Sequence, residues 1–144
     1  MRIGYQCSQA LLAAALALSV QAASAEVVLI VSARNPCGTL SAAQVSDIFL
    51  GNSTSFPAGA AATPVDQTDG SPLRDEFYRK ALGKSPAQVK AYWSKVIFTG
   101  KGRPPREAGD SAAVRKQVAD SGSAIGYVER SAVDASVKVV FSLN

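Results

Sequence analysis

The sequence predicts an α/β fold in which helices flank a mixed sheet. An unbroken apolar run rich in β-branched residues, 26–32, is typical of a strand that is buried on both faces. Amphipathic helical patterns with clear start signals follow it and alternate with further strand-like runs. The expected element order, β-α-β-α-α-α-β-β, favours a mixed sheet covered by helices.

Four helices are expected, and each begins at a capping residue: Ser41, Ser71, Ser85 and Asp110. Two of these serines have Gln three residues later, which is the spacing of a capping box. Glycines follow the first, second and fourth helices, at Gly51, Gly83 and Gly122. The residues expected to face inward are Val45, Ile48, Phe49, Leu73, Phe77, Ala81, Leu82, Val89, Tyr92, Trp93, Val96, Ile97, Ala113, Val114 and Val118.

Three further segments are expected to be strands. Residues 62–65 form a short β-like run that leads into a polar turn, and residues 124–128 and 137–141 are rich in β-branched residues. The intervening segment 99–106 is rich in Gly and Pro and carries several cations, so we expect a loop there. With no internal repeat or linker, these elements suit one domain spanning residues 26–144.

The first 25 residues have the pattern of a secretory signal peptide. Arg2 supplies a positive start, residues 10–20 are apolar, and Ala23-Ser24-Ala25 is a cleavage site of small residues. The apolar run is too short for a membrane span. We therefore expect a periplasmic or secreted protein that does not span a membrane.

Composition excludes several kinds of chemistry. The sequence has no His, which removes Ser-His-Asp and Cys-His catalysis and the commonest metal ligand. The formal charge of +4 is too small to indicate nucleic-acid binding. Beyond the signal peptide only Cys37 remains, and we interpret it as a small buried residue, with an intermolecular disulfide as the alternative. We expect no enzyme, no metal and no cofactor.

The most informative segment is the turn before the second helix. Asp69-Gly70 predicts a tight turn with positive φ at Gly70, and Ser71-Pro72 predicts a capped helix start. The free N–H groups of such a start, at the positive end of the helix dipole, bind small oxyanions. Arg74 can reach back over the helix start. Candidate anion-binding residues are Gln67, Thr68, Asp69, Gly70, Ser71 and Arg74; the alternative is an ordinary capped helix that binds nothing.

A second candidate site is the basic loop, which we define as Lys101, Arg103 and Arg106. Charges on a Gly- and Pro-rich loop are most often solvated, but this cluster also suits an acidic partner. The carboxylates Asp75 and Glu76 lie in a first helical turn, where acids favour the dipole, and so do not indicate acid–base catalysis.

Four short segments resemble the substrate-binding proteins of phosphate ABC transporters. They are Phe49-Leu50-Gly51, Asp69-Gly70-Ser71, Phe98-Thr99-Gly100 and Ala124-Ile125-Gly126-Tyr127-Val128. The resemblance implies a type II periplasmic-binding-protein fold, of which this chain would form a single lobe. In that family two lobes close over phosphate, and an Asp beside a Ser-Gly-Thr run accepts a hydrogen bond from the protonated ligand, which discriminates against sulfate.

Carried over to this chain, the resemblance matches Asp69 to the family's Asp and matches Gly70 and Ser71 to its turn. The sequence departs from the family at three positions: Gln67 replaces an Arg, Pro72 a Gly and Leu73 a Thr. Arg74 is the residue that can compensate for the lost charge.

These observations lead to two functional hypotheses. The first is an exported binding protein that holds phosphate or a similar oxyanion and is linked to phosphate ABC transport. The second is a module of the same fold that captures no ligand and contacts an envelope partner through the basic loop. A hydrolase ranks last, because the sequence has no His, metal cluster or nucleophile elbow.

Overall fold

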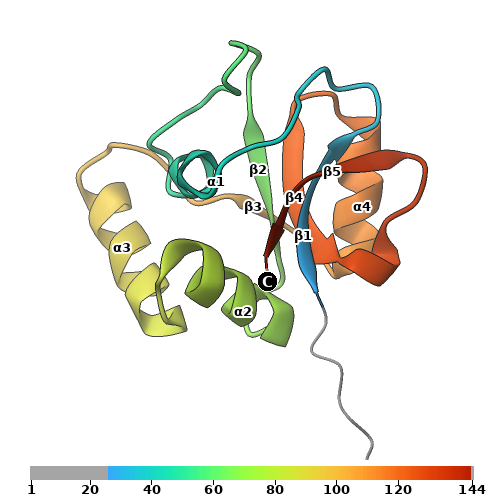
Figure 1. The fold of residues 1–144 in the computed structure, drawn as a ribbon. Coiled ribbons are helices and arrows are strands. Elements are labelled where there is room, and N and C mark those ends of the chain that lie inside the picture. Colours follow the sequence, from blue (N-terminus) through green and yellow to red (C-terminus); the bar gives the residue numbers. More distant parts are fainter. Residues whose placement is uncertain (1–25, 144) are drawn as a thin grey trace, which may run out of the picture.

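The computed structural model describes residues 26–143, so the predicted signal peptide lies outside the described residues. The elements, in chain order, are β1 (Val27–Ser32), α1 (Ala42–Phe49), β2 (Thr63–Gln67), α2 (Pro72–Leu82), α3 (Pro86–Phe98), β3 (Arg106–Gly109), α4 (Ser111–Asp120), β4 (Ala124–Glu129), a 3-10 turn (Arg130–Ala132) and β5 (Val137–Leu143). They form a five-stranded mixed sheet with helices on both faces (Figure 1), which confirms the predicted fold class.

The strand order is β3-β2-β4-β1-β5. β2 runs parallel to both β3 and β4, whereas β1 pairs antiparallel with β4 and β5. The carboxyl ends of the three parallel strands therefore meet at one edge of the sheet. The apolar run at the start of the chain forms β1 and lies inside the sheet, where all six of its residues are buried, as its composition predicts.

Each face of the sheet has its own apolar core. On one face, α1, α2 and α3 pack over strand residues such as Leu29 and Tyr127. The Phe77 ring stacks on the Tyr127 ring with centroids 3.9 Å apart. On the other face, α4 buries Val114 and Val118 against β1, β2 and β4. Successive strand residues point to opposite faces, which explains how one short sheet supports two cores.

The predicted helix starts are confirmed. Ser41 and Ser85 each form a complete capping box with the Gln three residues later, and Asp110 caps α4. Ser71 caps α2, with Pro at its first position. Cys37 is buried, with 6% of its surface exposed, and burial raises the pKa of its thiol.

Three details of the sequence prediction are wrong. The loop predicted over 99–106 ends earlier, because Arg106 begins the edge strand β3, whose sequence Arg-Glu-Ala-Gly lacks the β-branched residues that signal a strand. β2 continues through Gln67 instead of ending at Val65. Ile97, expected to face inward, is 55% exposed, because the last turn of α3 extends beyond the core.

A polar cluster lies buried at the carboxyl end of β2. Asp66 is 1% exposed and accepts hydrogen bonds from the hydroxyls of Tyr127 and Tyr78, the latter at 2.5 Å. The backbone N–H of Gln67 donates to the same carboxylate at 2.9 Å, and Arg74 Nε lies 3.8 Å from that carboxylate. Burial raises the pKa of Asp66, although these donors and the guanidinium oppose that rise. The cluster joins β2 to both β4 and α2.

Replacing Gly126 by Ala should destabilise the contact between β4 and α4. A Cβ at this position would lie 2.5 Å from Val114 Cγ1, and both groups belong to packed elements. We expect the free energy of unfolding to fall by about 1–3 kcal/mol, measured by urea denaturation. Gly122→Ala is the control, because a Cβ there meets nothing within 4 Å. Equal stability of the two variants would contradict this packing.

Asp66→Asn should weaken the fold because it removes the charge that two phenols and a guanidinium hold in place. We expect a loss of about 2–3 kcal/mol in the free energy of unfolding, since buried groups lose their partner. Asp120→Asn, which removes an equal charge from the exposed end of α4, should change stability by less than about 0.5 kcal/mol. A loss no larger than that of the control would show that the cluster does not stabilise the fold.

Candidate anion site

The predicted turn lies where the sheet topology favours a binding site. The chain leaves β2 through α2 and leaves the neighbouring parallel strand β3 through α4, and these helices cover opposite faces of the sheet. In open α/β sheets a crevice forms outside the carboxyl ends of two such strands, and ligands bind there. Figure 1 shows α2 below and α4 on the other side of the sheet. The start of α4 also lies at this edge, because Gln67 Nε2 at the end of β2 donates to Ser111 Oγ at 3.0 Å.

The turn itself has the predicted geometry. Gly70 has a φ of 83°, which favours glycine, and the Ser71 amide donates to Thr68 O at 3.1 Å. Ser71 Oγ accepts from the Arg74 amide at 3.4 Å as the helix cap. The Thr68 amide donates to Gly109 O at 3.0 Å, which attaches the turn to the end of β3.

Two amides of the turn are not hydrogen-bonded within residues 26–143; of their residues, Gly70 is exposed and Leu73 is 8% exposed. The N–H groups of Gly70 and Leu73 have no acceptor within residues 26–143, whereas those of Thr68, Ser71 and Arg74 are bonded as described. Both free amides lie at the start of α2, where the helix dipole favours negative charge. Part of the predicted donor set is therefore free and part is occupied.

The Arg74 side chain reaches back over the helix start, as the spacing predicts. Its Nη1 donates to Gln67 O at 3.1 Å and to Glu107 Oε1 at 2.7 Å. Its guanidinium carbon lies 5.6 Å from the centre of the Tyr78 ring. Burial lowers the pKa of Arg74, but the Asp66 carboxylate and the other partners outweigh burial and raise it above the ordinary value.

Glu107 is a component of the site that sequence reasoning missed. Its Oε1 accepts from the Asp69 amide at 3.1 Å and from Arg74 Nη1, so a single carboxylate oxygen occupies the point where two donors meet. Glu107 lies on β3, next to Asp66 in the parallel register. The sequence could not predict that Glu107 lies beside the turn, because the two segments are far apart in the chain. Only the pairing of β3 with β2 brings them together.

The other predicted residues lie in contrasting environments. Gln67 is 3% exposed, and its amide nitrogen donates to both Ser111 Oγ and Tyr127 O, the latter at 3.1 Å. Its Oε1 accepts from the Ser71 hydroxyl at 3.5 Å. The side-chain amide of Gln67 therefore positions the turn, and both of its N–H groups donate hydrogen bonds within the protein. Thr68 and Asp69 are exposed at the surface of the turn.

A cavity of about 410 Å³ lies beside the turn, between α2 and α3. Asp69, Asp75 and Arg74 line its polar side, and Trp93 is among the residues of its apolar side. Trp93 is 6% exposed, and its Nε1 finds no hydrogen-bond partner within the described part of the chain. The turn therefore borders a space of small-molecule size.

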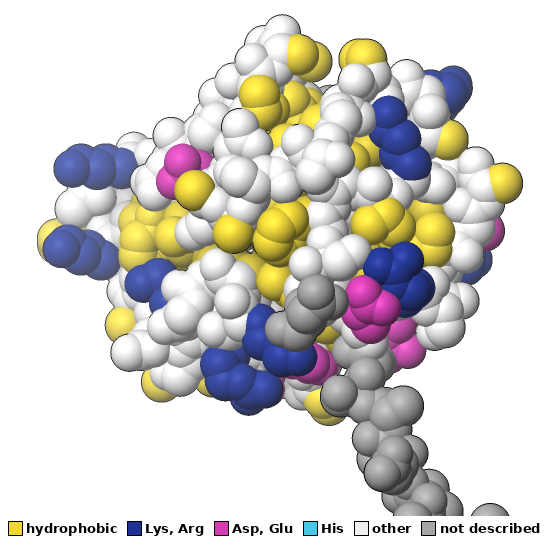
Figure 2. Space-filling model, viewed as in Figure 1, with side chains coloured by type: hydrophobic (Ala, Val, Ile, Leu, Met, Phe, Trp, Pro, Cys, Tyr) yellow, Lys and Arg dark blue, Asp and Glu magenta, His cyan; other side chains and the backbone are white. Residues whose placement is uncertain are grey.

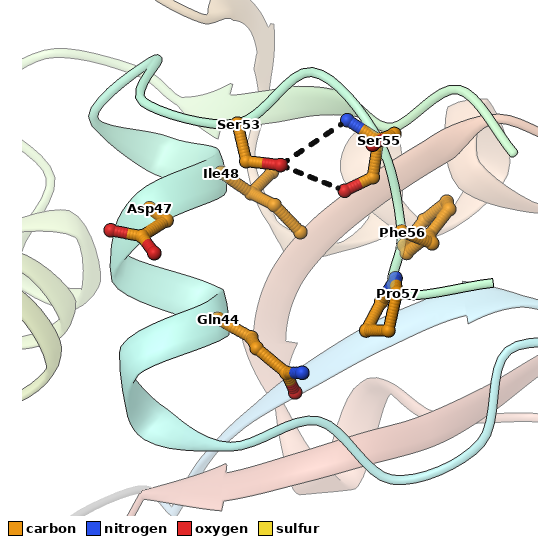
Figure 3. Close-up of a pocket in the computed structure, with 7 residues that line it drawn as sticks. All are labelled: Gln44, Asp47, Ile48, Ser53, Ser55, Phe56 and Pro57. Carbon is orange, nitrogen blue, oxygen red and sulfur yellow. Dashed lines mark hydrogen bonds between the residues drawn. The ribbon is translucent and has the colours of Figure 1, made fainter. Parts of the chain in front are cut away.

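A separate pocket between α1 and the loop after it is a poor site for an anion (Figure 3). It measures about 260 Å³, and none of its lining residues is a cation. The Gln44 side chain already accepts from the Ser41 amide, and Ser53 Oγ donates to Ser55 O at 3.0 Å. Asp47 adds negative charge.

The basic loop does not join the turn. Arg103 and Arg106 line a pocket of about 270 Å³ with residues of α1 and β2, while Lys101 lines a neighbouring one. All three cations are exposed. None of them lines the cavity beside the turn.

Two further findings concern residues 26–143. They contain no cluster of three or more His, Cys, Asp or Glu side chains suited to a metal ion. No helix among them combines the length and the apolar character that a bilayer crossing requires.

Comparison with known proteins identifies the fold. No protein-family model matches the sequence, and no curated protein matches it. Among solved structures, a protein described as a phosphate ABC transporter substrate-binding protein of Clostridium perfringens, with phosphate bound, has a TM-score of 0.65 and 26% identity, over 81% of this chain and 44% of its own.

An ABC-type phosphate transport receptor from Vibrio cholerae has a TM-score of 0.64 at 18% identity, over 81% of this chain and 45% of its own. PstS from Borrelia burgdorferi has a TM-score of 0.59 at 11% identity. This chain thus spans less than half the length of these proteins. Its mixed sheet flanked by helices matches the fold of the phosphate ABC transporter substrate-binding proteins, which the sequence motifs indicated.

Proposed function

We propose that this protein binds phosphate or a similar small oxyanion at the start of α2, without converting it chemically. The observation that carries the proposal is the Glu107 carboxylate oxygen, which accepts from both the Asp69 amide and Arg74. A backbone amide of the turn and a guanidinium of α2 therefore both donate to one carboxylate oxygen. A phosphate oxygen also accepts hydrogen bonds from such donors, and it forms strong charge-assisted hydrogen bonds with a guanidinium.

The proposed ligand site combines free and displaceable donors. The Gly70 and Leu73 amides and the helix dipole attract the anion, and Arg74 supplies the positive charge. Ser71 and Thr68 add hydroxyls, and Gln67 holds Ser71 in place. Asp69 lines the cavity beside Arg74, where its carboxylate would accept a hydrogen bond from a protonated phosphate. Sulfate carries no such proton, so Asp69 would repel it.

The structural neighbours support a binding role for the protein. They are described as substrate-binding or transport-receptor proteins, and one was solved with phosphate. We propose that this chain is likewise exported to the periplasm or secreted, as the signal-peptide pattern of residues 1–25 indicates. Its link would be to a phosphate ABC transporter.

A second candidate function is that of an interaction module that captures no ligand. The observation in its favour is that Arg74, Ser71 and Gln67 all have protein partners. The basic loop would then contact an envelope partner. Phosphate binding by the purified protein separates the two candidates, because only the first requires it.

Calorimetry with phosphate and sulfate tests the proposal directly. The protein should bind phosphate more tightly than sulfate, and Asp69→Asn should reduce this preference by about tenfold, because one charge-assisted hydrogen bond to phosphate and one repulsion toward sulfate disappear. Asp75→Asn is the matched control, since it removes an acid from the same cavity and should weaken discrimination little. No heat with either anion at millimolar concentration would refute anion binding.

Glu107→Gln tests whether the carboxylate competes with the ligand. We expect phosphate affinity to rise about three- to tenfold, since a nearby negative charge at a partly exposed site costs roughly 1 kcal/mol. Asp120→Asn controls for the change in net charge and should leave affinity within about twofold. Unchanged or weaker binding in Glu107→Gln, with binding intact in the unaltered protein, would show that the anion lies elsewhere.

A further inference from the structure

Helix α3 and the segments that flank it carry charged side chains of a single sign. Residues 84–106 contain six cations and no Asp or Glu: Lys84, Lys90, Lys95, Lys101, Arg103 and Arg106. All except Lys84 are exposed. Of the ion pairs formed within residues 26–143, none involves a cation of this segment. In the space-filling view, Lys and Arg side chains project from the edge of the molecule where α3 lies (Figure 2).

This surface also carries the most exposed large apolar side chain of the described residues. Phe98 is 93% exposed and Ile97 is 55% exposed, whereas the other aromatic side chains of α3 are mostly covered. Exposing a Phe ring to water is costly unless the ring is buried against something else in the working state of the protein. Lys95 precedes Phe98 by one helical turn, and Lys101 follows it.

The backbone holds this tip in a defined shape. Gly100 has a φ of 69°, its amide donates to Ile97 O at 3.1 Å, and the Lys101 amide donates to Val96 O at 3.1 Å. These two bonds are those of a Schellman motif, which ends the helix and reverses the chain. Phe98 therefore lies on the last turn of a finished helix instead of a loose loop, with cations before and after it.

A pocket of about 350 Å³ opens next to the tip. Lys101 and Arg103 line it together with Val96, Tyr92 and polar groups of residues 52–54. Its cations match a phosphate headgroup, and its apolar wall matches the start of an acyl chain. A protein–protein interface normally has an apolar centre larger than one Phe and one Ile, so the observations favour a lipid surface over an acidic protein.

We propose that this surface docks the protein on an anionic lipid bilayer, with Phe98 inserted among the headgroups and Lys95, Lys101 and Arg103 paired with lipid phosphates. The segment has the features of an interfacial anchor, namely an aromatic side chain among cations that bind anionic lipid. The docking surface uses none of the residues proposed to hold the anion, so it stands or fails independently of anion binding.

Sedimentation with vesicles tests the proposal. The protein from residue 26 onward, without the predicted signal peptide, is mixed with vesicles of phosphatidylcholine alone or of phosphatidylcholine and phosphatidylglycerol in equal parts. We expect binding to the anionic vesicles only, and we expect its loss in high salt, because screening weakens the attraction of the cations. Lys95→Gln with Lys101→Gln should lower the partition coefficient by at least about tenfold, and Phe98→Ser by a similar factor.

The control variant combines Arg79→Gln with Lys116→Gln, which removes the same charge from exposed positions on α2 and α4. It should keep at least about half of the binding, since its cations lie away from the proposed contact. Circular dichroism melts of every variant check that each is folded. An unaltered protein that stays in solution with anionic vesicles would overturn the proposal and indicate an acidic protein partner. Equal loss in the control would also overturn it, because general charge would then explain the binding.

Discussion

The arrangement of this protein depends on one buried carboxylate. Asp66 lies at the carboxyl end of β2, and the hydroxyls of Tyr127 and Tyr78 bond to it from β4 and α2. A charge at such depth requires compensation, and Arg74 supplies it from the first turn of α2. The start of α2 is therefore fixed against the sheet by electrostatics as well as by the apolar contacts of Phe77. This fixed start places the turn and its free amides at the carboxyl ends of β2 and β3.

The same constraint determines the charge balance of the proposed site. Arg74 serves the buried Asp66 and the exposed Glu107, so an incoming anion competes with Glu107 for the guanidinium. In the two phosphate-binding structures compared above, the segment that matches this chain is less than half of the protein. A site exposed to water on one side binds more weakly than a closed cleft, because water weakens charge-assisted hydrogen bonds. The proposed anion site is therefore open to water, and competition from Glu107 lowers its affinity.

The sequence predicted much of this structure for identifiable reasons. Capping residues are local signals, so the starts of the four α-helices within residues 26–143 and the positive φ of Gly70 were predictable. The buried strand β1 followed from its composition. The features that the sequence did not predict depend on contacts between segments that are far apart in the chain. β3 is recognisable only by its pairing with β2, so Glu107 was missed with it. Asp66 resembled the start of a polar turn, because only the tertiary fold brings two tyrosines to its carboxylate.

The proposed anion site at the start of α2, which Asp66 fixes to the sheet, can be tested directly. The most direct measurement is a titration of ¹⁵N-labelled protein with inorganic phosphate, followed by two-dimensional NMR. We predict saturable shifts concentrated at the amides of Asp69, Gly70 and Leu73 and at the Arg74 side chain, because phosphate would displace Glu107 there. Shifts confined to other parts of the chain, or a spectrum that phosphate leaves unchanged, would contradict this proposal.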